Sequence, residues 1–293
     1  MRRLRNRSIV RPWTAALFLC TLLLAALPSL ADSGCDQRTL IIPLSDPVSG
    51  RQYEIHVSLP DGFSSGTQRG WPLVVLADGG RAFPHLSCIA RKLAREGAIG
   101  AEPVIVGLSY AAGESFEVSR RRDYTPTSGV VGYGGAAPYQ AYIRNVVLPH
   151  VEAQFATDPR QRYFWGHSYG GLLGAHILFT QPEMFQTYML GSPSFWFGDG
   201  AIYGFEKSFA TQRRRLDARV LLYVGGEEIA RYDPARRGNT RDMVAGMRQF
   251  EAHLRARRYP GLSITSAVIE GRDHMSAVRP GFEWALQSAM AAR

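Results

Sequence analysis

The stretch RYFWGHSYGGLL, from Arg162 to Leu173, decides the fold. It begins with a short apolar segment typical of a buried strand, turns sharply at GHSYG, and continues with the apolar residues of a helix. A serine flanked by glycines in such a strand–turn–helix projects its hydroxyl at the edge of a sheet, because only small residues fit around the crowded and strained backbone. The pattern G-x-S-x-G is short, so its weight comes from this structural context. The sequence therefore predicts Ser168 as a nucleophile.

Outward from this turn, apolar runs alternate with helical patterns. Strands are predicted at residues 39–44, 52–59, 72–77, 103–108, 162–165, 187–190, 219–224 and 263–269. Helices are predicted at residues 84–96, 139–155, 171–179, 240–257 and 282–291. Such alternation predicts an α/β fold of a single domain, with a mostly parallel central sheet flanked by helices. Residues 111–137 show neither pattern and are predicted to form a long functional loop.

A serine hydroxyl is a weak nucleophile unless a base activates it. Of the seven histidines, His274 differs from the others because it follows the last predicted strand, in a loop at the carboxyl edge of the sheet. Serine first and histidine last is also the order of the α/β-hydrolase triad. The acid is expected between them, after the strand at 219–224. Glu228 is preferred there, Glu227 and Asp233 are alternatives, and a Ser–His dyad without an acid also stays open.

An oxyanion formed during attack on a carbonyl needs backbone N–H donors. One is predicted to be the amide of Tyr169, directly after the nucleophile. The second is expected from the segment DGGR that follows the strand at 72–77. Gly79 and Gly80 are the preferred donors, and Arg81 is not separated from them by sequence.

These segments together resemble the esterase branch of the α/β hydrolases. More narrowly, they resemble exported siderophore esterases, which hydrolyse the trilactone backbone of catecholate siderophores such as enterobactin and salmochelin. The resemblance rests on LADGG, RRDYTP, GHSYGG, SPSFW, GGEE and DH, which begin at residues 76, 121, 166, 192, 225 and 273. It implies Ser168 as nucleophile and His274 as base, whereas members of the group vary in the acid.

Two of these segments suit an aromatic, anionic substrate such as a ferric catecholate siderophore. Arg120, Arg121 and Arg122 are expected near the mouth of the site, where they would attract a negative complex, and Arg121 and Arg122 are taken as the substrate-binding pair. Phe195 and Trp196 follow a strand end, so their rings are expected to form a wall of the pocket. The alternative for these residues is ordinary packing, or an ion pair with Asp123.

Other functions share the same catalytic parts. A generalist carboxylesterase, an acyltransferase or a thioesterase would use the same serine, histidine and acid. A non-catalytic binding protein of this fold is disfavoured because the three residues occur together in the chain order of a triad. No cofactor is implied, and the chain has no CxxC motif and no Cys–His cluster of the kind that binds zinc.

The N-terminus has the three-part layout of a secretory signal peptide. Residues 2–11 are basic, residues 14–30 form an apolar run that Pro28 interrupts, and small residues precede a cleavage site after Ala31. Residues 1–31 are therefore predicted to be removed, leaving residues 32–293 in the periplasm without stable membrane association. An uncleaved membrane anchor is the alternative. In an oxidising compartment, Cys35 and Cys88 are a candidate disulfide pair.

The net charge of +9 is concentrated in this N-terminal segment. Without the five arginines of residues 1–31, 29 basic and 25 acidic residues remain, a net charge of +4. The remaining arginine clusters are scattered and lack interleaved aromatic residues. The sequence therefore gives no indication of a nucleic-acid partner.

Overall fold

The central sheet of the computed structural model has the strand order β1-β2-β4-β3-β5-β6-β7-β8. The structure describes residues 39–64, 70–230 and 241–291, all within one compact unit, Asp36–Arg293. The strands are β1 (Thr39–Ser45), β2 (Gln52–Ser58), β3 (Trp71–Leu76), β4 (Val104–Leu108), β5 (Thr157–His167), β6 (Thr187–Gly191), β7 (Ala218–Gly225) and β8 (Leu262–Ile269). The α-helices are α1 (Gly79–Arg95), α2 (Phe116–Asp123), α3 (Ala136–Tyr142), α4 (Leu148–Phe155), α5 (Tyr169–Thr180), α6 (Phe197–Gln212), α7 (Met243–Arg257) and α8 (Val278–Met290). A short π-helical segment, η1 (Ile143–Val147), joins α3 to α4, and the 3₁₀ turn η2 (Pro182–Met184) precedes β6.

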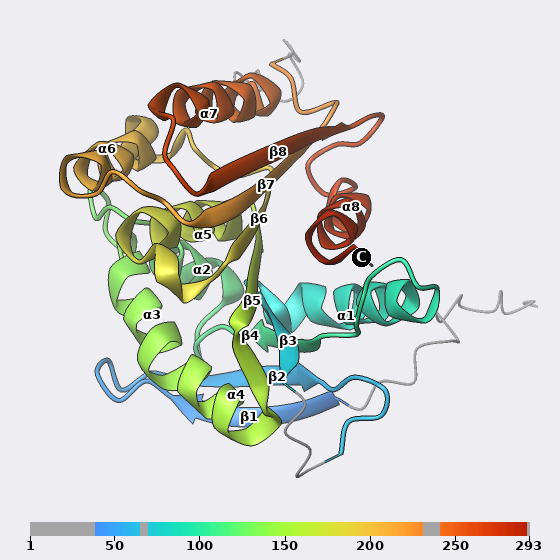
Figure 1. Cartoon of the computed structure of the whole chain (residues 1–293). Coiled ribbons are helices and arrows are strands. Elements are labelled where there is room, and N and C mark those ends of the chain that lie inside the picture. The colour runs from blue at the N-terminus through green and yellow to red at the C-terminus, as the bar shows by residue number, and fades with distance from the viewer. Residues whose placement is uncertain (1–38, 65–69, 231–240, 292–293) are drawn as a thin grey trace, which may run out of the picture. The chain divides into compact units, whose positions relative to one another are not determined.

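Helices cover the sheet on both faces. Strand β2 pairs antiparallel with β1 and β4, and the remaining neighbours pair in parallel. Helices α1 and α8 pack on one face, and the other helices lie on the opposite face (Figure 1). Strands β3 and β4 are buried along their whole length, as expected for continuous apolar runs between two helical layers. The predicted α/β architecture with a mostly parallel sheet is confirmed.

Parallel pairing brings the carboxyl ends of β3, β5, β6, β7 and β8 to one edge of the sheet. In the register of β5 with β6, His167 lies opposite Gly191, so the turn after each strand begins at the same level. Ligands of open parallel sheets bind beyond these carboxyl ends, because the connecting loops gather there. The functional site is therefore sought at this edge.

Two helices, α2 and α6, were not predicted from the sequence. The predicted loop at residues 111–137 contains α2, which begins after Ser115, whose hydroxyl caps the helix by accepting a hydrogen bond from the Val118 amide. The sequence FEVSRRRD of α2 has no apolar stripe, and this explains why periodicity did not reveal it. Helix α6 was also missed, because its first turn includes Gly198 and Gly200 in left-handed conformations that interrupt the helical pattern.

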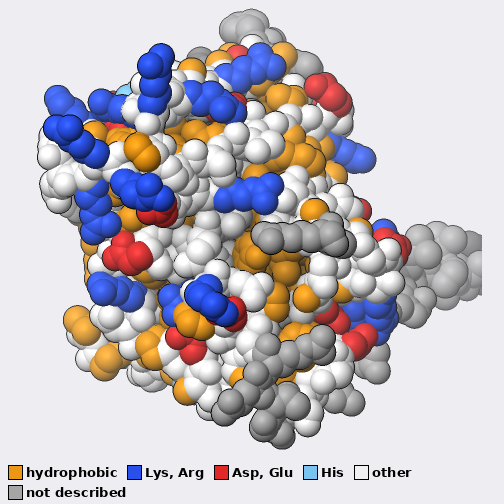
Figure 2. Space-filling model, viewed as in Figure 1, with side chains coloured by type: hydrophobic (Ala, Val, Ile, Leu, Met, Phe, Trp, Pro, Cys, Tyr) orange, Lys and Arg blue, Asp and Glu red, His pale blue; other side chains and the backbone are white. Residues whose placement is uncertain are grey.

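The predicted signal peptide and Cys35 lie outside the described residues. Within the described ranges, no helix is long and apolar enough to cross a membrane. Cys88 is disulfide-bonded, while its pairing with Cys35 stays a prediction. On the face shown in Figure 2, basic side chains are interspersed with acidic, apolar and neutral ones.

Candidate active site

Ser168 lies in the turn between β5 and α5, as predicted from its motif. Its φ of 59° and ψ of −117° are strained values for a residue with a side chain. The Ser168 amide donates to the Gly191 carbonyl at 2.8 Å, and the Ser168 carbonyl accepts from the Ser194 amide at 3.1 Å. A Cβ atom on Gly166 would lie 2.2 Å from the carbonyl oxygen of Gly170. The tight turn therefore requires glycine at position 166, and it holds the serine at the end of β5.

Glu228 follows β7 and is bonded on both carboxylate oxygens. Its Oε1 accepts from the Ser192 hydroxyl at 2.5 Å and from the Gly225 amide at 2.8 Å. Its Oε2 lies 2.6 Å from Nδ1 of His274. The Glu228 residue is buried, with 5% of its surface exposed, whereas Glu227 is exposed. The structure thus brings Glu228 to the histidine, and Asp233 lies outside the described residues.

The contact with Glu228 sets the tautomer of His274. An ionised carboxylate only accepts hydrogen bonds, so the proton of a neutral His274 lies on Nδ1 and Nε2 is left free to accept another. The His274 ring also packs against His167, with ring centroids 4.6 Å apart. Burial, assisted by the neighbouring His274, lowers the pKa of His167 well below its usual range. His167 is therefore a neutral neighbour of the His274 ring at neutral pH.

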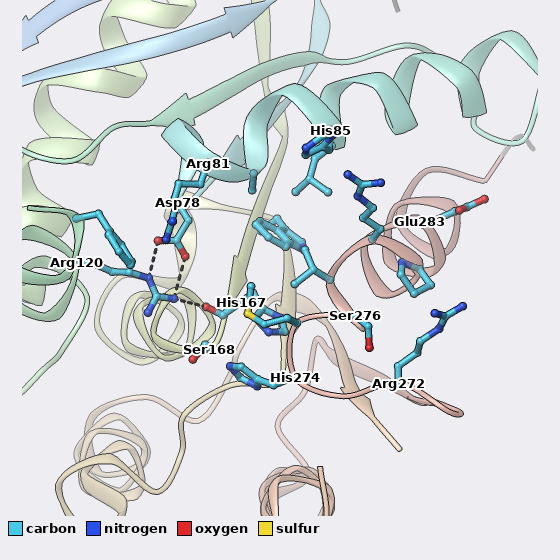
Figure 3. A pocket seen from close by; sticks show the side chains of 18 of the residues that line it. Asp78, Arg81, His85, Arg120, His167, Ser168, Arg272, His274, Ser276 and Glu283 are labelled. Atoms are coloured by element: carbon cyan, nitrogen blue, oxygen red, sulfur yellow. Dashed lines mark hydrogen bonds and ion pairs between the residues drawn. The ribbon is translucent and has the colours of Figure 1, made fainter. Parts of the chain in front are cut away.

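Ser168 and His274 together line two cavities. The larger has a volume of about 860 Å³ and extends along α1 and α8; the smaller has a volume of about 440 Å³ and extends towards α7. Both residues, with Met275, belong to the walls of both cavities. Figure 3 shows the two side chains next to one another at the larger cavity. When the scissile bond of a substrate lies at Ser168, the two parts of the substrate could therefore occupy the two cavities.

The predicted oxyanion donors lie at the first turns of two helices. Tyr169 begins α5, and Gly79 and Gly80 begin α1. The first amides of a helix have no acceptor within it and are free to bind an anion. The Arg81 amide is already bonded to the Asp78 carbonyl, which separates it from the two glycines. Tyr169 and either Gly79 or Gly80 thus remain the candidate donors.

The arginines of α2 face different surroundings. Arg120 lines the larger cavity, whereas neither Arg121 nor Arg122 lines either cavity. Arg122 instead pairs with Asp123 at 2.8 Å and also contacts Glu114, so it takes the alternative structural role. The guanidinium of Arg121 lies 5.7 Å from the ring centre of Tyr133. Of the three arginines expected near the mouth of the site, Arg120 lines the cavity, and the expectation for Arg121 and Arg122 is corrected.

Phe195 and Trp196 also separate. Phe195 is buried in the core, where its ring stacks on Phe250 with centroids 3.9 Å apart, so it does not form a pocket wall. Trp196 does line the smaller cavity, and the guanidinium of Arg241 lies 3.4 Å from the centre of its ring. The aromatic wall predicted from the segment SPSFW is therefore supplied by the tryptophan.

Sequence reasoning missed several polar residues that hold the site. Ser192 follows β6 and donates to Glu228, and Asp78 follows β3 and pairs with Arg120 at 2.6 Å. Both come directly after predicted buried strands, so their place at the shared carboxyl edge was an available signal. Arg120 was expected near the mouth of the site, but its pairing with Asp78 was not, because its helix was not recognised.

This geometry can be compared with known proteins. The sequence profile of the family described as "Putative esterase" matches residues 47–265. The chain belongs to this esterase family. It is a carboxylic ester hydrolase.

Named relatives of this esterase act on siderophores. It is 31% identical over 249 residues to a siderophore triacetylfusarinine C esterase of Aspergillus fumigatus, covering 78% of this chain and 85% of that protein. It is 26% identical to the ferri-bacillibactin esterase BesA of Bacillus subtilis, covering 80% and 83%. Among solved structures, the siderophore hydrolase EstB from Aspergillus nidulans matches with a TM-score of 0.75 at 24% identity, covering 91% and 98%. That likeness confirms the α/β-hydrolase fold.

Proposed function

We propose that the esterase hydrolyses its substrate through Ser168, His274 and Glu228. The Ser168 hydroxyl attacks the ester carbonyl while Nε2 of His274 accepts its proton, and the buried Glu228 stabilises the imidazolium. The tetrahedral oxyanion is held by N–H groups at the first turns of α5 and α1. Collapse expels the alcohol, which takes the proton from His274. Water then repeats the attack on the acyl-enzyme and releases the acid.

The observation that carries this proposal is the 2.6 Å contact between Nδ1 of His274 and Glu228 at a cavity wall shared with Ser168. A carboxylate at Nδ1 directs the basic nitrogen away from itself and stabilises the charge that forms on the ring. A histidine without that partner would be free to adopt either tautomer. The arrangement therefore supports a triad over a Ser–His dyad.

We further propose that the substrate is the trilactone backbone of a ferric catecholate siderophore. The larger cavity, about 860 Å³, is at the upper end of the range for small-molecule sites. Its walls include Arg81, Arg272 and Arg279, and none of these arginines forms an ion pair with a described carboxylate. Unpaired guanidinium groups attract anionic oxygens, and a ferric tris-catecholate complex is strongly anionic. The two relatives named above are siderophore esterases, which supports the broader class of siderophore substrates.

As part of the same proposal we infer that the reaction takes place in the periplasm, because residues 1–31 are predicted to be a signal peptide. Hydrolysis of the backbone would separate the three iron-binding arms and weaken their joint hold on the metal, because ligands that are no longer linked bind at a lower effective concentration. Export of the enzyme would then allow iron release outside the cytoplasm.

The serine mechanism is tested with Ser168→Ala and His274→Ala in the purified enzyme. Each should lower kcat for an activated neutral ester by about 10⁶-fold, as loss of a triad nucleophile or base does in other serine hydrolases. Circular dichroism should show an unchanged fold. Substantial turnover by purified Ser168→Ala would overturn the nucleophile assignment.

The substrate is tested by a product profile over a panel of esters that includes iron-free and ferric catecholate trilactones. Turnover of trilactones well above that of short-chain esters supports the siderophore proposal, and absence of trilactone cleavage ends it. Arg272→Gln and Arg279→Gln should weaken turnover of the ferric complex more than that of a neutral ester, and the difference should shrink at high salt. Arg248→Gln, at an exposed arginine of α7, is the matched control.

A further inference from the structure

The side chain of Arg120 joins two segments of the site. Its Nε donates to Asp78 Oδ1 at 2.6 Å, and its Nη2 donates to Asp78 Oδ2 at 3.0 Å. The same Nη2 donates to the carbonyl oxygen of His167 at 2.9 Å. Asp78 directly precedes α1, and His167 directly precedes Ser168. Figure 3 shows the guanidinium between these two residues at the cavity.

Asp78 is held by more than this ion pair. Its Oδ1 also accepts from the Tyr110 hydroxyl at 2.9 Å, and its backbone amide donates to the Tyr124 hydroxyl at 2.9 Å. Asp78 is the residue before the first turn of α1 and has a left-handed φ of 59°. Because its backbone is not in the relaxed region, these contacts and the link to Arg120 fix the direction in which α1 begins.

The Asp78 carboxylate also lies close to the start of α5. A Cβ atom placed on Gly170 would be 3.3 Å from Asp78 Oδ2. An uncompensated negative charge there would oppose a developing oxyanion bound at the first turns of α1 and α5. Arg120 supplies the compensating charge: burial opposes it, yet the Asp78 carboxylate raises the pKa of Arg120 above its ordinary value. The guanidinium therefore stays charged at any working pH.

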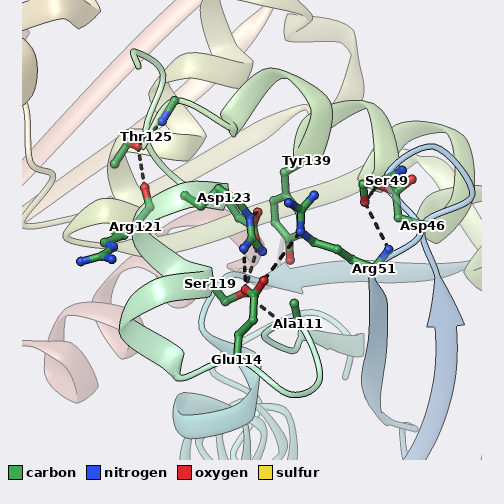
Figure 4. A network of polar contacts seen from close by, with 12 residues as sticks. Asp46, Ser49, Arg51, Ala111, Glu114, Ser119, Arg121, Asp123, Thr125 and Tyr139 are labelled. Atoms are coloured by element: carbon green, nitrogen blue, oxygen red, sulfur yellow. Dashed lines mark hydrogen bonds and ion pairs between the residues drawn. The ribbon is translucent and has the colours of Figure 1, made fainter. Parts of the chain in front are cut away.

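The helix that carries Arg120 is anchored from its other side. Asp123, at the end of α2, accepts hydrogen bonds from Ser119 at 3.0 Å and from the Tyr53 hydroxyl of β2 at 3.1 Å. Arg122 donates to the same carboxylate at 2.8 Å. Figure 4 shows Asp123 and Ser119 within this network. Burial raises the pKa of Asp123, against the opposing effect of Arg122. The network ties α2 to the sheet, so Arg120 reaches the site from a fixed base.

We propose that Arg120 is a positioning residue for the oxyanion site. It holds the first turn of α1 and the nucleophile turn at a fixed separation, and it neutralises Asp78 beside them. The inference rests on the proposed serine mechanism but not on the siderophore substrate. Its effect falls on the transition state, because the oxyanion exists only after attack on the carbonyl.

The test uses p-nitrophenyl acetate, a neutral ester that does not need the arginine-bearing cavity. Arg120→Gln should lower kcat by about 10²-fold, within the range for misplacement or loss of one oxyanion donor, while KM changes less than threefold. Affinity for phenylboronic acid, which forms a tetrahedral adduct on the serine, should fall in parallel with kcat. Arg248→Gln is the control for loss of an arginine and should behave as the parent enzyme.

Arg120→Lys is a second variant that tests the proposal if Arg120→Gln does not fold. Lysine retains the charge next to Asp78 but lacks the planar fork that reaches both Asp78 and His167. We expect it to fold and to lose at least tenfold in kcat. A kcat within threefold of the parent in either folded variant overturns the proposal, as does a loss of kcat without a loss of phenylboronic acid affinity. Activity of Ser168→Ala would overturn the serine mechanism itself. An inactive Ser168→Ala together with a near-normal Arg120 variant would overturn only the positioning role of Arg120.

Discussion

Replacing Glu228 by glutamine should lower kcat about 10⁴-fold with little change in KM. Glutamine has nearly the same shape as glutamate, but one of its two terminal atoms is an N–H donor. The fixed amide of Gly225, which donates to Oε1 at 2.8 Å, requires the amide oxygen at that position. If the glutamine amide were rotated by 180°, its NH₂ group would face the Gly225 N–H, and this unsatisfied buried pair would cost about 1–3 kcal/mol of free energy. The glutamine NH₂ is therefore held towards His274.

That orientation reverses the tautomer of the histidine. With an N–H donor opposite it, Nδ1 of His274 must become the acceptor, so the proton moves to Nε2, the atom required as base. The corresponding Asp-to-Asn change in a Ser-His-Asp triad lowers kcat about 10⁴-fold. This factor corresponds to about 5 kcal/mol of lost transition-state stabilisation.

The assay is steady-state hydrolysis of p-nitrophenyl acetate at pH 7.5, with Glu227→Gln measured alongside. Glu227 is exposed, and Nδ1 of His274 is bonded to Glu228 instead, so the Glu227 variant should keep at least a third of the parent kcat. A thermal unfolding midpoint within a few degrees of the parent would show that both variants are folded. Near-normal kcat in Glu228→Gln would refute the tautomer argument, and a large loss in Glu227→Gln instead would reassign the acid.

Four further outcomes are expected. Ser192→Ala removes a hydrogen bond to the charged Glu228 and should lower kcat about tenfold; no loss would show that the Gly225 amide alone holds the carboxylate. Gly166→Ala should lower the stability to urea by about 1–3 kcal/mol, since its Cβ meets the Gly170 carbonyl, and an unchanged midpoint would contradict this crowding. Burial lowers the pKa of His176 to about 4, so the folded protein binds fewer protons than the unfolded chain and loses stability as pH falls from about 6.5 towards 4. In urea titrations at pH 7.5 and pH 4.5, the free energy of unfolding of His176→Phe should therefore fall by roughly 2–3 kcal/mol less than that of the parent. Equal decreases in the two proteins would refute this assignment. Mass spectrometry of the exported protein without reductant should show Cys35 joined to Cys88, and two alkylatable thiols would reject the bridge.

The sequence predicted the parts of the site that depend on strand ends. Ser168, Glu228 and His274 each follow an apolar run that becomes a strand, and parallel pairing alone brings such positions to one edge. These signals are local, so composition and spacing reveal them. The strand end alone does not distinguish Glu228 from Glu227, because adjacent residues in a turn point in different directions.

The arginines were placed less well for a related reason. Their roles depend on the rotation of α2 about its axis, and a short polar helix carries no apolar stripe from which that rotation can be read. Phe195 was misplaced because an aromatic residue after a strand can turn inward or outward. Its stacking on Phe250 is a contact between residues 55 positions apart, which no local pattern contains.

The arrangement of α2 has a consequence for the spacing of its sequence. Successive side chains of an α-helix are turned by about 100°, so Arg120, Arg121 and Asp123 point to three different environments. Deleting one residue between Ser115 and Arg120 would bring Arg121 to the position facing His167, but it would also carry Asp123 out of phase with Tyr53. Inserting one residue would present Ser119 to the nucleophile turn instead. In either case the number of arginines is unchanged, but the side chains of α2 no longer face the groups that they contact. The number of residues between Ser115 and Arg120 therefore matters more for this part of the site than the number of positive charges.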